Sequence, residues 1–320
     1  EGLEKVYDNW LKAEAGARRV IRNRKGAVIE EINQVKAAQS GKDIYSSIDM
    51  RLQYIAYRSL ARAINYHAAK SGSAVLLDAR TGEVLAMVNQ PSYNPNQAKQ
   101  KTSGNRRNRA LTDVFEPGST IKPFTFAAAI DKGLYNQKSI IDTSPGWYTV
   151  SGHPIKDYRN YGPLDLAGIL RKSSNVGASR IALSMKDEEL WRSFSDYGFG
   201  KPPGVIFPGE SSGYFRHFSD WQKLDHAIMG YGYGVSVSIT QLARAYAMIA
   251  NQGQHVDVSL IRKEPGIKVE NQVERHVMSS KTAKMVLEMM EEVVGPKGTA
   301  QLAAIAGYRI GGKTGTTKKS

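Results

Sequence analysis

The chain has 320 residues, 41% of them hydrophobic and none cysteine, which suits about two domains with a sizeable core and excludes disulfides and cysteine metal sites. Lysine and arginine outnumber aspartate and glutamate by 44 to 30, a net charge of +14 that favours an anionic partner. The sequence lacks zinc-finger spacing and an aromatic RNA-binding block, so we predict no nucleic acid partner.

Residues 1–45 have the pattern of the end of one module. Leu3 to Ala15 favours a short helix. Arg18 to Asn23 and Ala27 to Ile32 alternate around the turn Arg24-Lys25-Gly26, which predicts a hairpin. No apolar run approaches the ~20 residues that a membrane span needs, and no signal peptide is visible.

A second domain is expected from Ser46 onward. Asp49 is a good N-cap for a helix from Met50 to Ala69. Ser73 to Asp78 and Glu83 to Asn89 are rich in strand-forming residues around a short turn. This pattern predicts a second hairpin, so part of the main sheet is antiparallel.

The stretch Glu116-Pro-Gly-Ser119-Thr-Ile-Lys122 opens a helix expected from Thr120 to Asp131. Ser119 and Lys122 are three residues apart and therefore share one helix face. A serine hydroxyl needs a base within reach to become a nucleophile, and a lysine amine is such a base once burial or a helix N-terminus lowers its pKa. Alone, the pair is a weak signal, because Ser119 would also serve as a simple helix cap.

Two later stretches strengthen the signal. Ser173-Ser174-Asn175 lies at an expected turn between helices, and Lys313-Thr314-Gly315-Thr316 lies in an expected strand from Gly307 to Thr317. Ser-x-x-Lys, Ser-Asp-Asn and Lys-Thr-Gly together form the penicillin-recognising set. The middle element here keeps its outer serine and asparagine.

The remaining elements complete the fold expectation. Gly146 to Asp157 favours a loop or short hairpin, and helices are expected over Thr240 to Ala250 and from Ser279 or Ser280 to about Val294. Early strands, central helices and a final strand predict an α+β fold in which helices flank an antiparallel sheet.

On these motifs the sequence resembles a class B penicillin-binding protein of the septal type found in Gram-negative bacteria. The similarity extends over essentially the whole chain. Besides the three motifs, the block Asn108-Arg-Ala-Leu-Thr-Asp-Val-Phe and the block Tyr231-Gly-Tyr-Gly-Val-Ser236 are similar to that family. From the residues alone, Tyr231 to Gly234 indicates only a tight backbone crossing.

The resemblance implies a pedestal module ending within residues 1–45 and a transpeptidase domain over 46–320. Its fold is a five-stranded sheet between helical layers, of which at most three strands are expected here. It also implies a single-pass inner-membrane anchor upstream, further sheet strands downstream and a catalytic domain in the periplasm.

The activity that the resemblance implies is peptidoglycan D,D-transpeptidation during septal cell-wall synthesis. Ser119 would attack the penultimate D-Ala carbonyl of a stem peptide, Lys122 would accept its proton, and Ser173 would pass a proton to the leaving D-Ala. Asn175 would hold a substrate amide.

The terminal carboxylate would be bound by Lys313, Thr314 and Thr316, with Gly315 allowing close approach. The backbone N–H groups of Ser119 and Thr316 would form the oxyanion hole. A β-lactam would acylate Ser119 in the same way. The implied protein partners are membrane-bound divisome proteins, including a lipid-II polymerase, and no cofactor is implied.

Two other motifs fit only formally. Gly307 to Thr314 satisfies the P-loop pattern but precedes no visible helix, and Gly209-Glu-Ser211-Ser-Gly213 satisfies the nucleophile-elbow pattern but follows a proline-rich loop. The six histidines show no metal-ligand spacing, so we predict no metal site.

Rival functions on the same fold remain open. They are an elongation-specific transpeptidase, a D,D-carboxypeptidase, a serine β-lactamase and a non-catalytic sensor that is acylated. The chain shows no obvious glutamate motif for deacylation, which argues against the β-lactamase.

Overall fold

Helix α5 (Lys122–Asp131) lies at the centre of the larger body of the molecule. The structure is a computed structural model that describes residues 2–94, 106–263 and 275–317. Every residue of α5 from Lys122 to Ile130 is buried. A helix that is enclosed on all sides must lie in the core. The core therefore encloses the segment that follows Ser119.

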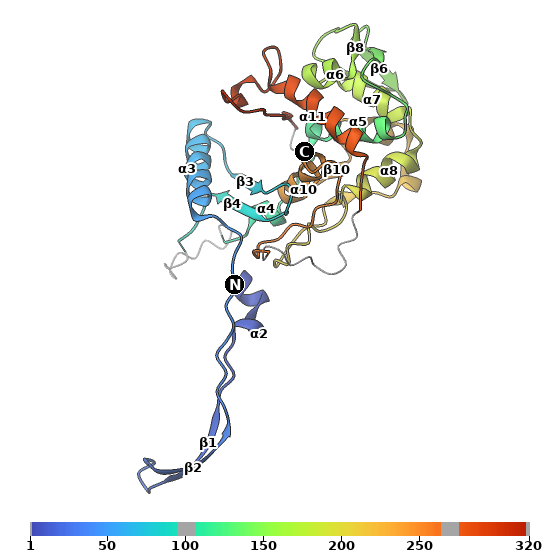
Figure 1. Cartoon of the computed structure of the whole chain (residues 1–320). Coiled ribbons are helices and arrows are strands. Elements are labelled where there is room, and N and C mark those ends of the chain that lie inside the picture. The colour runs from blue at the N-terminus through green and yellow to red at the C-terminus, as the bar shows by residue number, and fades with distance from the viewer. Residues whose placement is uncertain (1, 95–105, 264–274, 318–320) are drawn as a thin grey trace.

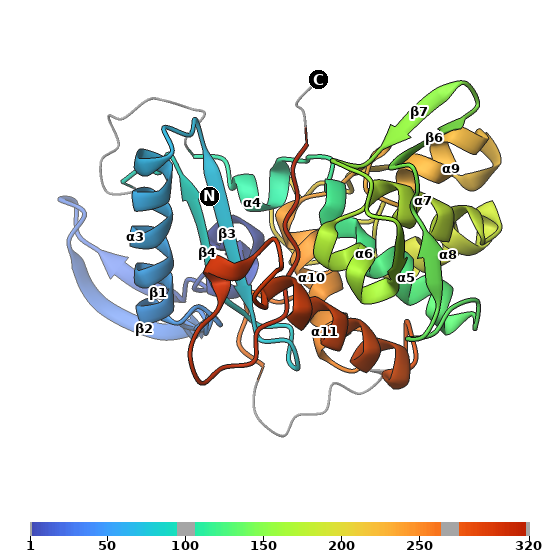
Figure 2. The same cartoon turned by 90° about the horizontal axis from the view of Figure 1, so that it is seen from above.

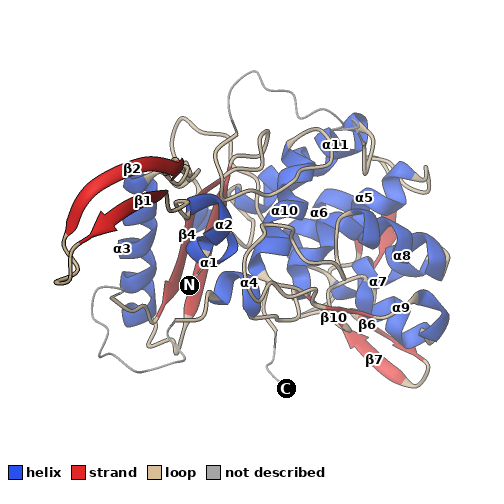
Figure 3. Cartoon of the chain, turned by 90° about the horizontal axis from the view of Figure 1, so that it is seen from below, coloured by secondary structure: helices blue, strands red, loops and turns tan. Residues whose placement is uncertain are grey.

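Five helices pack around α5. Figure 3 shows them gathered in one part of the molecule, and the core between them contains aromatic as well as aliphatic side chains. The Phe124 ring packs against the rings of Tyr197, Phe199 and Tyr246, with centroids 5.0–5.5 Å apart. Such tilted and edge-to-face contacts are the favoured geometries of aromatic pairs. The five are α6 (Leu166–Lys172), α7 (Asn175–Leu183), α8 (Asp187–Asp196), α10 (Ile239–Ala250) and α11 (Ser280–Val294).

The main hairpin is formed by β3 (Gly72–Leu77) and β4 (Val84–Gln90), which pair antiparallel with Gly72 opposite Gln90. Helix α3 (Met50–Tyr66) lies along it on the side away from α5, as Figure 2 shows, while α10 packs on β3. Asp49 caps α3 by accepting the N–H groups of Arg51 and Leu52. The expected cap, helix, hairpin and α+β class are confirmed.

The described residues also form three shorter strand pairs. One of them, β6 with β7, is the hairpin expected within Gly146 to Asp157. The pairs are β5 (Ile140–Asp142) with β8 (Pro163–Asp165), β6 (Trp147–Val150) with β7 (His153–Lys156), and β9 (Tyr214–Phe215) with β10 (Val235–Ser236). The short helical elements are α4 (Arg109–Thr112), α9 (Lys223–Met229), η2 (Gly118–Ile121), η3 (Phe218–Asp220) and η4 (Gln301–Ala303).

The N-terminal residues form an arm that projects from the body (Figure 1). Its hairpin, β1 (Ala17–Arg22) with β2 (Val28–Lys36), confirms the expected one. The expected helix is divided at Tyr7, whose φ of −101° and ψ of 21° are not helical, into α1 (Leu3–Val6) and α2 (Asp8–Leu11). It ends before Ala15 because Lys12 is already extended. None of the described helices combines the length and hydropathy that crossing a bilayer requires.

The prediction of a strand from Gly307 to Thr317 is wrong. The backbone of this segment is extended. A β-strand, however, also needs ladder hydrogen bonds to a neighbouring strand, and among the described residues no strand pairs with this segment. The N–H of Gly312 instead donates to the carbonyl of Met290 in α11 at 3.2 Å. The main sheet of the described chain therefore has two strands, where up to three were expected.

We expect Phe194→Ala to lower the free energy of unfolding by about 3–5 kcal/mol, because it opens a cavity in the aromatic core. Phe194 is fully buried and packs on Tyr197, Phe199 and Phe215. Urea denaturation measures the change. The control Tyr158→Ala, at a side chain that is 96% exposed, should stay within about 0.5 kcal/mol of the wild type. Equal losses in both variants would contradict the packing argument.

Candidate active site

Ser119 lies in the 3-10 turn η2, which runs directly into α5 at Lys122. Residues three apart in such a turn lie over one another, so both side chains share one side, as the spacing predicts. Ser119 is half-buried and Lys122 is fully buried. Pro123 occupies the first turn of α5, where its missing N–H costs little.

The buried amine of Lys122 is bound to the turn between α6 and α7. Its Nζ donates to the carbonyl of Ser173 at 2.6 Å and to Asn175 Oδ1 at 2.9 Å, and it lies 3.4 Å from Ser173 Oγ. Among the described residues the Ser119 hydroxyl forms no hydrogen bond. The structure therefore joins Lys122 to Ser173 and Asn175, while Ser119 is joined to Lys122 only by sharing one side of the turn.

Ser173 adopts an unusual backbone conformation. Its φ of 58° and ψ of 38° are left-handed, in a residue with a side chain. Such strain is stored mainly at functional sites. The next residue, Ser174, is the N-cap of α7 and accepts the N–H of Gly177 at 2.9 Å. The middle serine of the motif is thus a cap, and the outer residues face Lys122.

Lys313, from the C-terminal segment, contacts the same serine. Its Nζ donates to Ser173 Oγ at 2.9 Å, so that hydroxyl lies between two lysine nitrogens. Burial, followed by the positive charge of Lys313, lowers the pKa of Lys122 well below its ordinary 10.5, and Asp157 opposes this shift. Burial lowers the pKa of Lys313 to about 8. Both amines therefore release protons more readily than ordinary lysines.

The segment that follows Lys313 packs against the turn of Ser119. A Cβ on Gly315 would lie 2.9 Å from the carbonyl oxygen of Pro117, and one on Gly118 would lie 3.1 Å from that of Thr316. Only glycines allow this approach. The Thr314 hydroxyl points instead to Thr299 Oγ1, at 3.0 Å.

The Tyr231-Gly-Tyr-Gly234 stretch forms a tight backbone crossing with the turn of Ser119, as its sequence predicts. Gly118 donates its N–H to the carbonyl of Gly232 at 3.0 Å. Gly232 has a φ of +92°, and a Cβ there would lie only 2.0 Å from the Gly118 carbonyl oxygen. Glu116 Oε1 accepts the N–H of Gly234 at 2.9 Å, which closes the crossing.

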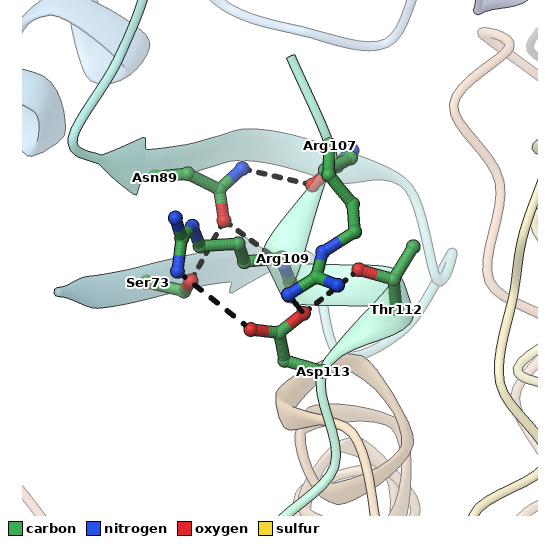
Figure 4. A network of polar contacts seen from close by, with 8 residues as sticks. Ser73, Asn89, Arg107, Arg109, Thr112 and Asp113 are labelled. Carbon is green, nitrogen blue, oxygen red and sulfur yellow. Dashed lines mark hydrogen bonds and ion pairs between the residues drawn. The ribbon is translucent and has the colours of Figure 1, made fainter. Parts of the chain in front are cut away.

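A polar network fixes the approach to this turn (Figure 4). Asn89 at the end of β4 accepts from the Ser73 hydroxyl at 2.7 Å and from the N–H of Ala110 in α4 at 2.9 Å. Six residues before Ser119, the carboxylate of Asp113 pairs with Arg107 at 2.7 Å. The chain therefore enters the Ser119 turn from a segment tied to the main hairpin.

Sequence reasoning missed three residues at the site, Lys156, Asp157 and Thr299, and also the structural role of Glu116. Asp157 accepts from Ser174 and from the backbone of α7, and the carbonyl of Lys156 accepts from Asn175. A lone carboxylate or carbonyl after a short hairpin carries no spacing signal toward a motif 16 or more residues away. Only the fold brings them together.

The P-loop-like and elbow-like stretches of the sequence have other structural settings here. In the described chain no helix follows Lys313 as a P-loop requires. Glu210, within the elbow-like stretch, uses its carboxylate to accept the N–H groups of Gly204, Val205 and Phe207. Among the described residues no group of three or more histidine, aspartate or glutamate side chains is placed to hold a metal ion.

Comparison with known families gives two matches along the chain. Residues 72–320 match the penicillin-binding protein transpeptidase domain, and residues 1–46 match the penicillin-binding protein dimerisation domain.

Curated relatives match over the whole chain. It is 43% identical to the peptidoglycan D,D-transpeptidase FtsI of Escherichia coli K12 and 40% identical to the probable peptidoglycan D,D-transpeptidase PbpC of Pseudomonas aeruginosa. All of this chain is covered, but only 53% and 56% of those relatives. The chain thus spans about half the length of the curated relatives it matches.

Two solved structures share the fold. A peptidoglycan glycosyltransferase from Burkholderia ambifaria superposes with a TM-score of 0.79 and 43% identity, covering 86% of this chain and 82% of that one. The transpeptidase domain of penicillin-binding protein 3 from Burkholderia pseudomallei gives 0.78 and 41%, covering 86% and 78%.

The α+β fold and the serine turn with its two lysines define the class of penicillin-recognising serine proteins. Within that class, the chain belongs to the penicillin-binding protein transpeptidase domain family.

We expect Gly232→Ala to disrupt the crossing behind Ser119, because the new methyl group would collide with the Gly118 carbonyl. Its matched control is Gly204→Ala, at a φ of +82° with no atom within 4 Å of the added carbon. The control bears only backbone strain, about 1–2 kcal/mol. Denaturant melts and labelling by a fluorescent penicillin measure both variants. Gly232→Ala should lose more stability and at least tenfold in labelling rate; equal behaviour would refute a role for the crossing.

Proposed function

We propose that this chain carries the catalytic part of a peptidoglycan D,D-transpeptidase that cross-links stem peptides during septal cell-wall synthesis. The observation that carries the proposal is the hydrogen-bonded cluster of Lys122, Ser173, Asn175 and Lys313 beside the turn of Ser119. The names of the relatives, peptidoglycan D,D-transpeptidases at 40–43% identity, support the same activity.

In this proposal the Ser119 hydroxyl attacks the carbonyl of the penultimate D-Ala. Lys122 accepts the hydroxyl proton, and burial, which lowers its pKa well below 10.5, makes the free amine that accepts it easier to form. The backbone N–H groups of Ser119 and Thr316 stabilise the developing oxyanion. The two segments that bear them are packed together through Gly118 and Gly315.

The proton then has a short route to the leaving group. Ser173 Oγ lies beside both lysine amines and passes a proton to the departing D-Ala nitrogen as the C–N bond breaks. Asn175 holds a substrate amide. An amine of a neighbouring stem peptide attacks the Ser119 ester, forms the new amide and releases the serine.

The terminal carboxylate of the donor peptide is bound by protonated Lys313 with the hydroxyls of Thr314 and Thr316, since charge-assisted bonds are the strong ones. For this the Thr314 hydroxyl turns from Thr299 toward the substrate. A β-lactam presents the same carboxylate and a strained amide, and therefore acylates Ser119.

The wider assignments belong to the same proposal. Residues 1–45 end a non-catalytic pedestal and residues 46–320 belong to the transpeptidase domain. The protein is anchored in the bacterial inner membrane with this domain in the periplasm. It works there with membrane-bound divisome proteins, including a lipid-II polymerase.

We expect benzylpenicillin to form a stable one-to-one adduct with the full-length protein, because the sequence given shows no obvious glutamate motif that would activate a deacylating water. Intact mass spectrometry over time measures the adduct, and Ser119→Ala is the control in which it should be absent. A transient adduct with rapid drug loss would instead identify a β-lactamase. Failure of folded wild-type protein to form any adduct would refute the nucleophile assignment.

We expect the second-order rate constant of acylation to follow a bell-shaped pH profile. The rate rises with pH as Lys122 loses its proton, below its ordinary pKa of 10.5. It falls above about pH 8 as Lys313 loses the charge that binds the carboxylate. In Lys313→Arg the guanidinium stays protonated, so the alkaline limb should vanish while the acidic limb remains. An unchanged alkaline limb in that variant would exclude this role for Lys313.

A further inference from the structure

Asp157, directly after β7, binds the start of the Ser173–Asn175 motif with both carboxylate oxygens. Its Oδ1 accepts the N–H groups of Asn175 at 2.5 Å and Val176 at 3.0 Å. Its Oδ2 accepts the Ser174 hydroxyl at 2.5 Å. A negative charge at a helix N-terminus is stabilising, and bonds to a carboxylate are stronger than bonds between neutral groups. The first turn of α7 is therefore held from outside its own helix.

The residue before Asp157 sets the orientation of the Asn175 amide. Asn175 Nδ2 donates to the carbonyl of Lys156 at 3.2 Å, which leaves Oδ1 to accept from Lys122 Nζ at 2.9 Å. A carbonyl only accepts and the lysine nitrogen donates, so these two neighbours define which end of the amide faces Lys122. Two consecutive residues thus fix both the backbone and the side chain of Asn175.

The hairpin that carries Asp157 is itself fixed to α7. The N–H of Asp157 donates to the carbonyl of Gly146 at 2.8 Å, which closes the hairpin at its base. On β6, the Tyr148 hydroxyl lies 2.7 Å from Ser179 Oγ in the second turn of α7. The hairpin therefore contacts α7 both at the start of the helix, through Asp157, and in its second turn, through Tyr148. A change at Asp157 consequently affects the start of the helix and the site.

Two charged groups act on the Lys122 amine. Lys313 opposes its protonation and Asp157 favours it. The other groups in contact with that amine, the Ser173 carbonyl and hydroxyl and the Asn175 amide, are neutral. Asp157 is therefore placed to influence Lys122 through charge as well as through geometry.

We propose that Asp157 is a positioning residue for acyl transfer, which holds the Ser173–Asn175 turn against Lys122 and offsets the positive charge of Lys313. This inference rests on the proposed function. It assigns to the β6–β7 hairpin, which contains none of the three motifs, a direct effect on the reactivity of Ser119.

The test compares Asp157→Asn with Asp165→Asn in the full-length protein. Asp165 is a matched control, because its carboxylate caps the neighbouring helix α6 through the N–H of Gly168 at 2.7 Å, away from Lys122. The measurement is the rate constant of benzylpenicillin acylation against pH, read by intact mass, with Ser119→Ala as the blank.

Asp157→Asn should slow acylation at least tenfold at neutral pH. The acidic limb of its profile should move to lower pH, because loss of the negative charge lowers the pKa of Lys122 further. Asp165→Asn should stay within about twofold of the wild type with an unmoved limb, since Asp165 is not among the charged groups that act on the Lys122 amine. A merely structural role would change the rate but leave the limb in place.

A second variant covers the case in which Asp157→Asn does not fold. Ser174→Ala removes one donor to Asp157 together with the N-cap of α7 but keeps the charge of Asp157, so acylation should slow several-fold with the limb unmoved. An unchanged rate in Ser174→Ala, or an unchanged rate and limb in Asp157→Asn, would overturn the inference. If both aspartate variants lose the same activity without a shift, Asp157 supports only the fold. Absence of acylation in the wild type would refute the proposed function itself, and this inference with it.

Discussion

The buried amine of Lys122 is the constraint on which the rest of the site depends. An ammonium group without water is unstable unless it is paired, and here its hydrogen-bond partners are a carbonyl, a hydroxyl and an amide oxygen, all neutral. The core that encloses α5 therefore lowers the pKa of Lys122 well below its ordinary 10.5 and favours the deprotonated amine. The aromatic packing around Phe124 is thus part of the chemistry as well as of stability.

The site also requires that segments far apart in the sequence come together at the turn of Ser119. The backbone at Gly118 is contacted by the crossing at Gly232 and by the segment after Lys313. Each contact requires a residue without a Cβ, so three stretches more than 80 residues apart in sequence are held within a few ångströms of the Ser119 turn. This arrangement gives a rigid main chain around a serine hydroxyl that has no hydrogen bond to another described residue.

The α+β class, the main hairpin, the cap at Asp49 and the helix after Ser119 follow from patterns that are local, and all could be read from the sequence. The motif trio also placed Lys122, Ser173 and Lys313 together, because their chemistry is recognisable as a set. The contributions of Asp157 and Thr299 could not be read, since they depend on tertiary contacts. The strand expected near Lys313 failed because extended sequence does not supply its own pairing partner.

The role of Ser174 bears on how the middle position of the motif varies. Ser-Asp-Asn is the usual form, and aspartate is as good an N-cap as serine. In this chain, however, the Ser174 hydroxyl donates to Asp157 at 2.5 Å, and an ionised side chain there would face a like charge. In this chain the hairpin supplies the carboxylate at the start of α7, through Asp157. Positions 157 and 174 should therefore covary across homologous chains. A chain with a carboxylate at one of them should have a neutral residue at the other, so that one negative charge stays at the start of α7.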